Sequence, residues 1–507
     1  MAPFARHLLL IAALPAAACT MFPVPEDERA FVSLLNSLNG GPTAGGQVSA
    51  TATLPPATGL ERSYDLNGDG FHDLVFGDFD FNSNAGRVLI YHGAAGGIAN
   101  YSVGAGSTGA DTILGGPTTS DFGQALAMGD IDGDGYPDVV VGADLHNSGT
   151  GAVYIFYNEG GAGISSRDLA SGGSAGTTLT GENTGDDFGT TVNVGDYNGD
   201  GYADVIVHAP EYNTNHGRLY VFLSRGSTGI AANLGAAGAD VIVTGSATRR
   251  FFFDDYQTAL LADVNGDGRD DIVACNIDFG VPYVEMLVFH STGGAMHVDL
   301  GAGGTADSTV VGIPGVSTCS QGLAVGDING DGFADVVTSY NQYNTDQGRA
   351  YIFYGGSAGI TAGSLAAADT NLSGGAGTCR FGSRLRLADV NNDGYDDAIV
   401  GERGGSCALY HYYIFHGSAG GINDQDLSGA GTADTTLSEA GQGLTGTSIG
   451  AGDFNGDGFA DMAATDAGST EDIWIFYGTA GGITSGTTAS AGTVLDSITN
   501  FHITVPR

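Results

Sequence analysis

Apolar residues along this chain fall in short runs that glycine-rich and polar segments separate. Typical runs are "FGQALAMG" (122–129), "VVVGA" (139–143), "GAVYIFYN" (151–158) and "TTLTG" (177–181). They are rich in β-branched and aromatic residues and bounded by glycine, which is typical of strands joined by tight turns. The pattern therefore predicts an all-β protein in which four short strands form one unit.

This unit recurs seven times, and each copy contains an acidic nine-residue loop between its first and second strands. Successive loops begin 65, 66, 67, 64, 62 and 64 residues apart. Four-stranded units repeated at so regular a period are typical of a β-propeller, whose radial arrangement hides most sheet edges. We predict a seven-bladed β-propeller of four-stranded blades over residues 60–507, which leaves no room for a separate catalytic domain. The tail (493–505) resembles the outer strand of an eighth unit without a loop, and we expect it to close the ring against the first blade.

The acidic loops have a fixed pattern of oxygen-bearing side chains. Positions one, five and nine are Asp in all seven copies, position six is Gly, and position three is Asn except for Asp132 in the second loop. Carboxylates held this close repel one another unless a cation lies between them. A hard cation takes about six to eight oxygens from carboxylates, amides and backbone carbonyls, and glycine permits the tight turn that gathers them. We therefore predict a Ca²⁺ site in each of about seven hairpin loops.

The predicted ligands occupy positions one, three, five, seven and nine, with position seven contributing its backbone carbonyl. In loop order they are Asp65, Asn67, Asp69, Phe71 and Asp73; Asp130, Asp132, Asp134, Tyr136 and Asp138; Asp196, Asn198, Asp200, Tyr202 and Asp204; Asp263, Asn265, Asp267, Arg269 and Asp271; Asp327, Asn329, Asp331, Phe333 and Asp335; Asp389, Asn391, Asp393, Tyr395 and Asp397; Asp453, Asn455, Asp457, Phe459 and Asp461.

The alternative interpretation is that such Asp-, Asn- and Gly-rich strings are turns and nothing more. Seven aligned copies favour the metal site, and the scarcity of Cys and His in the loops argues against softer metals. We expect loop two, with its additional Asp132, to bind most tightly. In loop six Asn392 replaces the usual Gly at position four, which is tolerable because Asn accepts left-handed backbone angles. No bistable element is visible, so a structural role is expected rather than a sensing one.

Composition narrows the function further. The chain has 507 residues with 57 acidic and 16 basic side chains, so nucleic acid is an unsuitable partner. All 16 basic residues are Arg, which excludes lysine-dependent chemistry and phosphate-binding loops of the GxxxxGK type. The 11 His are scattered, and no HExxH, GxSxG or CxxC motif is present. The sequence therefore contains no catalytic motif, and no catalytic residue is assigned.

The amino terminus is typical of an exported protein. Arg6, the apolar run 8–14 and the small residues 16–18 predict a signal peptide over residues 1–18. Cys19 follows directly and resembles the lipidated cysteine of a bacterial lipoprotein, although Ala16 stands where that motif usually has Leu. We expect either a secreted protein or a lipoprotein of the outer membrane or cell surface, with contact to the membrane only through this anchor.

Two further expectations concern the rest of the covalent framework. Residues 19–59 combine a short amphipathic helix with a flexible linker. If Cys19 carries lipid, four cysteines are left to pair in an oxidising compartment, in any of three connectivities. Adjacency of the predicted blades favours the pairs Cys275–Cys319 and Cys379–Cys407.

The repeated unit "FG…GDxNGDGxxD…GrvYvfyG" resembles the FG-GAP repeat of the integrin α-subunit propeller and of its bacterial relatives, over roughly residues 60–507. The Phe-Gly pair is intact in several units, but the fifth has Cys319-Ser320 and the seventh has Thr445-Gly446 at that place. The resemblance implies a Ca²⁺-stabilised propeller that binds proteins through one face. It implies no particular ligand.

Connections between the second and third strands lie on the face opposite the acidic loops, because antiparallel connections alternate between the two ends of a sheet. These segments are rich in aromatic and amide side chains, and loops on a rigid scaffold often carry function. Ordinary solvated hairpin ends are the alternative. The candidate partner-binding residues are Phe79, Phe81, Tyr212, Tyr340, Tyr343 and Arg403.

The sequence leaves three functions open. The first is an exported module that binds an extracellular protein or glycan, for instance in cell adhesion. The second is an enzyme that acts on an extracellular polysaccharide, with its site in the propeller channel. The third is a structural envelope component without a discrete ligand. Acids, His and Arg converging in the channel would favour the enzyme.

Overall fold

The computed structural model describes residues 64–99, 101–102, 109–161, 163–251, 259–278, 283–312, 322–402, 411–438, 449–465 and 471–498. The predicted signal peptide, the lipidation candidate Cys19 and the predicted helix and linker (19–59) lie outside these residues, so those predictions stay untested. Among the helices of the described residues, none is long and apolar enough to cross a membrane.

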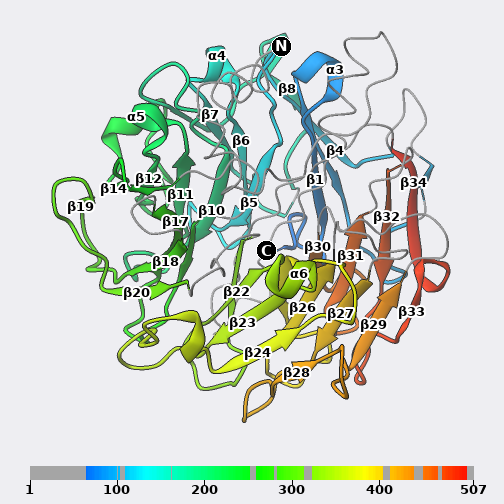
Figure 1. Ribbon diagram of the computed structural model, residues 1–507. Helices are drawn as coiled ribbons and strands as arrows, with labels where there is room; N and C mark the ends of the chain where they lie inside the picture. The colour runs from blue at the N-terminus through cyan, green and yellow to red at the C-terminus, as the bar shows by residue number, and fades with distance from the viewer. Residues whose placement is uncertain are drawn as a thin grey trace, which may run out of the picture. The chain divides into compact units, whose positions relative to one another are not determined.

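Seven sheets follow one another around a ring in the order of the chain (Figure 1). In blades two to seven the acidic loop separates the first two antiparallel strands, and the described first strands contact one another around the centre; in blade one the described strands begin after the loop. The predicted seven-bladed β-propeller is confirmed. The blades are, in order, β1 (Leu74–Asp78), β2 (Arg87–Tyr91) and β4 (Thr112–Gly115); β5 (Ala125–Gly129), β6 (Asp138–Ala143), β7 (Ala152–Phe156) and β9 (Thr177–Thr180); β10 (Thr191–Gly195), β11 (Asp204–Ala209), β12 (Arg218–Phe222) and β14 (Val241–Thr244); β16 (Ala259–Ala262), β17 (Asp271–Asp278), β18 (Tyr283–Phe289) and β20 (Ser308–Val311); β21 (Leu323–Gly326), β22 (Asp335–Tyr340), β23 (Arg349–Phe353) and β24 (Thr370–Ser373); β25 (Phe381–Ala388), β26 (Asp397–Glu402), β27 (His411–Phe415) and β29 (Thr435–Ser438); β30 (Ile449–Gly452), β31 (Asp461–Thr465), β32 (Glu471–Phe476) and β34 (Thr493–Ile498).

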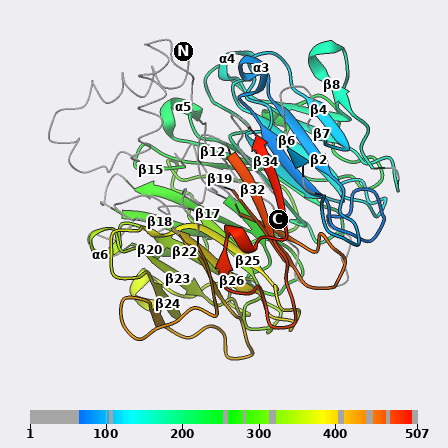
Figure 2. The ribbon, with the colours of Figure 1, turned by 90° about the vertical axis from the view of Figure 1, so that its right-hand side faces the viewer.

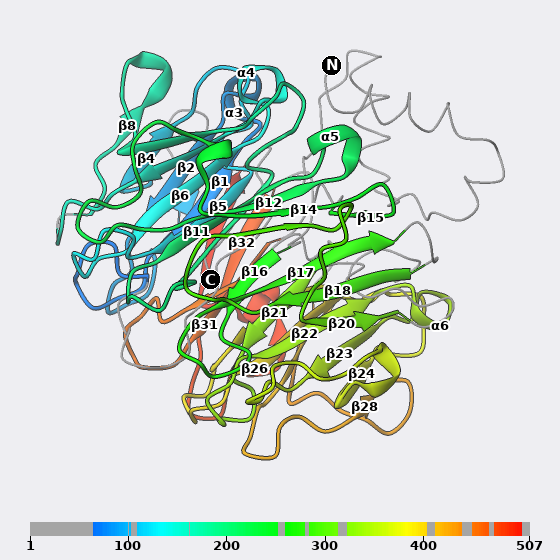
Figure 3. The same ribbon diagram turned by 90° about the vertical axis from the view of Figure 1, so that its left-hand side faces the viewer.

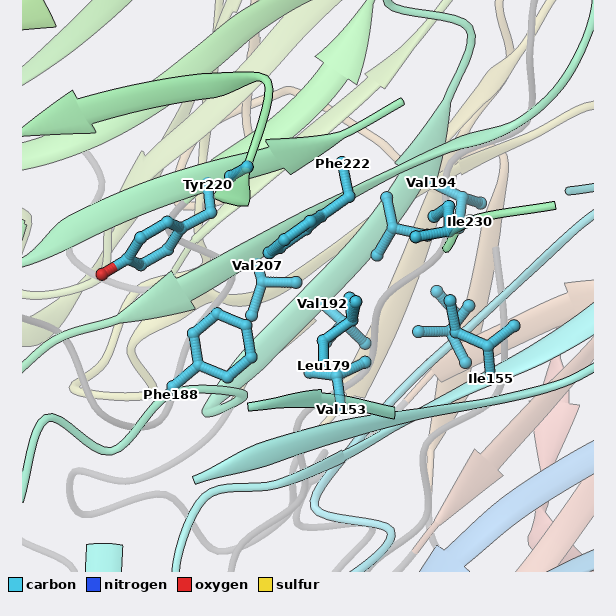
Figure 4. Close-up of a cluster of buried hydrophobic side chains, with 14 of the residues drawn as sticks. Val153, Ile155, Leu179, Phe188, Val192, Val194, Val207, Tyr220, Phe222 and Ile230 are labelled. Carbon is cyan, nitrogen blue, oxygen red and sulfur yellow. The ribbon is translucent and has the colours of Figure 1, made fainter. Parts of the chain in front are cut away.

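The hydrophobic core is divided into seven clusters, one between each pair of neighbouring blades, and the last cluster joins blade seven to blade one. Both faces of a strand are therefore buried, and along β6 Val139 faces the first blade while Val140 faces the third. Figure 4 shows the cluster between blades two and three, where the rings of Phe188 and Tyr220 meet edge to face with centroids 5.4 Å apart. Packing between blades holds the ring together.

A short parallel strand from the following repeat covers the outer strand of most blades. This fifth strand satisfies backbone groups at an edge that could otherwise pair with another chain. In blade four the outer strand β20 forms only an isolated bridge between Val311 and Ser364. The long strand β17 of this blade also pairs with the short strand β15 (Arg249–Arg250) (Figure 3). The fifth strands are β8 (Arg167–Asp168), β13 (Leu234–Gly235), β19 (Met296–Asp299), β28 (Gln425–Asp426), β33 (Gly486–Thr487) and β3 (Tyr101–Ser102).

The ring closes between the tail and the first repeat, as expected, but the tail belongs to the seventh blade. β34 is the outer strand of the seventh blade, paired with β32, and not material of an eighth unit (Figure 2). The first repeat closes onto it, because β3 pairs with β34 in parallel and Thr493 Oγ1 donates a hydrogen bond of 2.8 Å to the carbonyl of Ile98. The tail is thus ordinary fourth-strand material. The part of the prediction that concerns residues 499–505 lies outside the described residues.

The Phe-Gly pairs make the joints between neighbouring blades. The Phe fills the core between two blades, and its backbone forms a parallel bridge with the Gly that precedes the third strand of the blade before it. The three such bridges are Gly86 with Phe122, Gly151 with Phe188 and Gly348 with Phe381. A Cβ on Gly151 would lie 2.0 Å from the carbonyl oxygen of Phe188, so the backbones approach more closely than any side chain allows.

Replacement of Gly151 by Ala is expected to lower the free energy of unfolding by about 3 kcal/mol or more, because a fixed backbone atom occupies the Cβ position and φ is +76°. Gly172→Ala is the matched control: its φ is +95°, but a Cβ there meets nothing within 4 Å. The control should lose only the left-handed penalty of about 1–2 kcal/mol. Chemical unfolding in millimolar Ca²⁺ measures both variants, and equal losses would show that the joint tolerates a side chain.

Cys275 lies in β17, and both it and Cys379 are disulfide-bonded. Cys319 and Cys407 lie outside the described residues. The two pairings proposed from blade adjacency therefore stay predictions.

Candidate functional site

The seven acidic loops share one backbone conformation, in which carboxylate and amide side chains accept hydrogen bonds from nearby N–H groups. In loop one the carboxylate of Asp65 accepts from the N–H of Asp69 at 3.0 Å and of Gly70 at 2.8 Å. Glycines at positions four and six take positive φ, and Asn392 replaces the first of them with φ +54°, as expected. Each loop is thus a rigid turn that presents carboxylates on a preformed frame.

The position-nine carboxylates are buried in all seven loops. Asp138 accepts from the N–H of Ile131 at 2.9 Å and from that of Asn158 at 2.8 Å, one bond to each oxygen. Burial raises the pKa of the group because the charged form loses its hydration. A nearby cation would offset this cost. Burial raises the pKa to about 8 for Asp138, Asp204, Asp271, Asp335, Asp397 and Asp461, and it also raises the pKa of Asp73.

Loop two meets the requirements of a metal site most fully. One oxygen each from Asp130, Asp132 and Asp138 lies within 4.8 Å of the other two, and this is the one such acidic group among the described residues. Asp130 Oδ1 is also shielded from solvent and accepts no hydrogen bond. A buried carboxylate oxygen without a donor is a suitable ligand for a cation, and an all-oxygen donor set suits Ca²⁺ or Mg²⁺ rather than a softer metal. The residues fit a cation in this loop.

In other loops the side chain of the position-three Asn donates a hydrogen bond to an Asp of the same loop. The amide nitrogen of Asn67 donates to Asp69 at 3.0 Å, and that of Asn265 donates to both oxygens of Asp271, at 3.0 and 3.3 Å. In these loops the Asn amide donates a hydrogen bond to a carboxylate and so offsets part of its negative charge. In loop two Asp132 replaces the Asn and adds a negative charge instead. Ca²⁺ in the six other loops, and the position-seven carbonyls as ligands, stay predictions.

Position eight links adjacent loops, which the sequence interpretation missed. In three loops this side chain accepts a hydrogen bond from the N–H of position one in the preceding blade. The only available signal was a polar residue at position eight in these three loops, where the others have Pro or Ala. The bonds join His72 Nδ1 to Asp453 (2.8 Å), Asp270 to Asp196 (2.8 Å) and Asp396 to Asp327 (2.9 Å).

The opposite face carries a turn between the second and third strands in four blades. Each turn contains two or three consecutive non-glycine residues with left-handed angles, for example Asn213 at φ 50° and Thr214 at φ 63°. Such runs are rare because each residue costs about 1–2 kcal/mol. These turns are α3 (Phe81–Asn84), α4 (His146–Gly149), α5 (Tyr212–Asn215) and α6 (Tyr343–Asp346) (Figures 1 and 3).

The six candidate partner-binding residues differ in their position and in their exposure to solvent. Phe81, Tyr212 and Tyr343 each begin one of these turns, and Phe81 is 41% exposed, the one large hydrophobic side chain in the described ranges that is exposed. Phe79 is only 8% exposed and offers little surface to a partner, so its role in binding stays a prediction. Tyr340 is partly buried against the core between blades four and five. Arg403 lies outside the described residues.

The side chains of the innermost strands bear on the enzyme alternative. Within β5, β10, β16, β21, β25 and β30, the described innermost strands, none is acidic or His. Arg386 of β25 is buried, which lowers the pKa of its guanidinium to about 10, and its Nη2 donates to the carbonyl of Ala451 at 3.5 Å. These strands provide no paired carboxylates for acid–base chemistry.

Known proteins resemble parts of this chain. A model of the FG-GAP repeat matches residues 122–156, 188–222, 321–353 and 445–483. Phosphatidylinositol-glycan-specific phospholipase D of Bos taurus is 27% identical over 370 residues, which cover 67% of this chain and 42% of that protein. Integrin alpha pat-2 of Caenorhabditis elegans is 28% identical over 229 residues, covering 41% and 17%. Integrin alpha-7 of Homo sapiens is 40% identical over 99 residues, covering 18% and 8%.

This chain spans less than half the length of each of these relatives, which include integrin subunits as well as a phospholipase. The matched residues lie in blades two, three, five and seven, and each segment contains an acidic loop. Those of blades two and three also contain a Phe-Gly pair. Four segments of the chain match the FG-GAP repeat, and the chain is folded as a seven-bladed β-propeller.

Proposed function

We propose that this protein is a Ca²⁺-stabilised binding module that is exported to the cell surface or beyond it. The acidic loops hold the hairpins on one face of the propeller. The turns α3, α5 and α6 on the opposite face contact a protein or glycan partner, as in adhesion. This division assigns stability to one face and recognition to the other.

The observation that carries the proposal is the repeated display of an aromatic side chain on a strained, rigid turn. Tyr212 and Tyr343 begin equivalent turns in blades three and five, and Phe81 does so in blade one. A plain hairpin connection does not require an aromatic residue at the start of its turn. Strained backbone persists where the surrounding structure overdetermines it, and it gathers at ligand-binding sites. The innermost strands that the structure describes, in blades two to seven, offer no comparable observation in favour of the enzyme.

We expect the parent protein, with Cys19→Ser to avoid lipidation, to capture a partner from envelope and matrix extracts in millimolar Ca²⁺. The ring-deleting variant Phe81→Ala/Tyr212→Ala/Tyr343→Ala should lose it, because rigid aromatic side chains supply much of the energy at recognition sites. The measurement is mass spectrometry of the retained material.

The ring-retaining variant Phe81→Tyr/Tyr212→Phe/Tyr343→Phe is the matched control and should still capture the partner. Both variants must unfold at the temperature of the parent. A partner retained equally by the ring-deleting variant would move the contact surface away from the turns. No partner for a folded parent would favour a structural role.

A further inference from the structure

Three of the turns support their aromatic ring on an arginine. The guanidinium carbon of Arg87 lies 3.8 Å from the ring centre of Phe81, that of Arg218 lies 3.6 Å from Tyr212, and that of Arg349 lies 3.9 Å from Tyr343. In each case the arginine begins the third strand, six residues after the aromatic residue. The same stack thus recurs in blades one, three and five.

A hydrogen bond from Nε to a neighbouring side chain holds each of these arginines in place. Arg87 Nε donates to Asp78 at 2.8 Å, Arg218 Nε to Thr244 Oγ1 at 2.9 Å and Arg349 Nε to Ser373 Oγ at 2.8 Å. The side chain of Arg87 is 15% exposed, whereas Phe81 above it is 41% exposed. In blade one the guanidinium therefore holds the inner face of the ring and leaves much of the ring toward solvent. Tyr212 and Tyr343 are half-buried, and Tyr212 also packs against the core between blades two and three. A ring held this way loses little conformational entropy when a ligand binds.

The two residues at the tip of each turn are polar but uncharged, and in α6 the Asp346 that follows them forms an ion pair with Arg380. The exposed pairs are Asn82-Ser83, Asn213-Thr214 and Asn344-Thr345. An amide and a hydroxyl provide donors and acceptors in both directions. In a chain with 57 acidic residues, three exposed tips of this kind form a surface suited to a neutral, hydroxyl-rich ligand.

We propose that these three stacks, the aromatic platforms, bind a neutral polysaccharide. This inference rests on the proposed binding function and names its ligand class. The C–H face of a pyranose ring packs on each aromatic face, where the π-electron density is negative, and the sugar hydroxyls bond to the Asn and Ser or Thr of the tip.

Charged ligands fit this surface less well. The guanidinium on the inner face of each ring disfavours a second cation on the outer face. An anion would need accessible basic groups, but the side chains of Arg87 and Arg218 are only 15% and 17% exposed. Because the platforms recur in three blades, a polymer can engage more than one of them, which raises its affinity without new kinds of contact.

Affinity electrophoresis tests the inference on the full chain with Cys19→Ser in 5 mM Ca²⁺, in gels that contain laminarin, mannan or dextran. We expect at least one of these polymers to retard the parent, by an amount that changes little between 0.05 and 0.5 M NaCl. The ring-deleting variant should bind at least about tenfold more weakly. The ring-retaining variant should stay within about threefold of the parent, because it keeps all three faces.

Three results would overturn the inference: no retardation of the parent by any of the polymers, equal retardation of the ring-deleting variant, or retardation that added salt abolishes. Phe81→Ser alone, at the most exposed ring, gives a second reading if the triple variant fails to fold. If no polymer binds but the extract still yields a partner that the ring-deleting variant loses, the polysaccharide is excluded while the binding function stands. If neither experiment yields a ligand, both fail.

Discussion

Removal of Ca²⁺ is expected to lower the free energy of unfolding of this protein by about 10 kcal/mol relative to protein saturated with the ion. Extracellular Ca²⁺ modules bind with Kd of about 10⁻⁴–10⁻³ M, so an ion concentration tenfold above Kd stabilises the folded state by about 1.4 kcal/mol at each site. Seven loops multiply that contribution. The position-nine carboxylates are a second reason to expect a cation in the folded state. Burial disfavours their charged form and raises the pKa of Asp138 in loop two to about 8. Thermal and chemical unfolding in 5 mM Ca²⁺ and in excess EGTA measure the difference.

The alternative that the loops are turns alone makes the opposite prediction for the same experiment. Backbone N–H groups already satisfy part of each loop, as the bonds of Asp65 to Asp69 and Gly70 show, so turns without metal would unfold identically with and without EGTA. Mg²⁺ at the same concentration is the control. It should restore less stability than Ca²⁺, because it demands near-octahedral geometry and gives up its water reluctantly.

Asp138→Ala is expected to lower the free energy of unfolding by about 3–5 kcal/mol even in EGTA. Its two oxygens are the acceptors for the N–H groups of Ile131 and Asn158, and each buried donor left without an acceptor costs about 1–3 kcal/mol. In Ca²⁺ the loss should be larger, since the site also loses a ligand. Chemical unfolding under both conditions gives the two values.

Asp132→Asn is the matched variant in the same loop, because it installs the residue that the six other loops have at this position. It should leave stability in EGTA within about 0.5 kcal/mol of the parent, as expected for a surface change. Its effect should appear as weaker Ca²⁺ binding by this loop, measured by calorimetry. If Asp138→Ala were harmless in EGTA, the carboxylate would serve only the metal. If Asp132→Asn left the affinity unchanged, the acidic cluster of loop two would not be its metal site.

The predictions from sequence were most successful for features that form within a single repeat. Blade number and loop positions follow from a period near 64 residues and from Asp, Asn and Gly at fixed places. The left-handed angle of Asn392 followed from side-chain chemistry alone. These features depend on interactions within a few residues, so the pattern of one unit contains them and seven copies reinforce it.

Contacts between units could not be predicted in this way. His72 accepts a hydrogen bond from a residue 381 positions away, and β3 closes the ring onto β34. Phe79 and Phe81 are two residues apart and look alike in sequence, yet one ring is 8% and the other 41% exposed.

The sequence by itself determined the strands, their repetition and the oxygen-rich loops, because hydrophobic alternation, turn chemistry and charge repulsion act locally. Only the tertiary structure decided which loop gathers three carboxylates, which glycine meets a neighbouring backbone and which aromatic ring rests on an arginine. Those outcomes depend on distances between groups that packing around the ring brings together, and no spacing along the chain encodes such a distance.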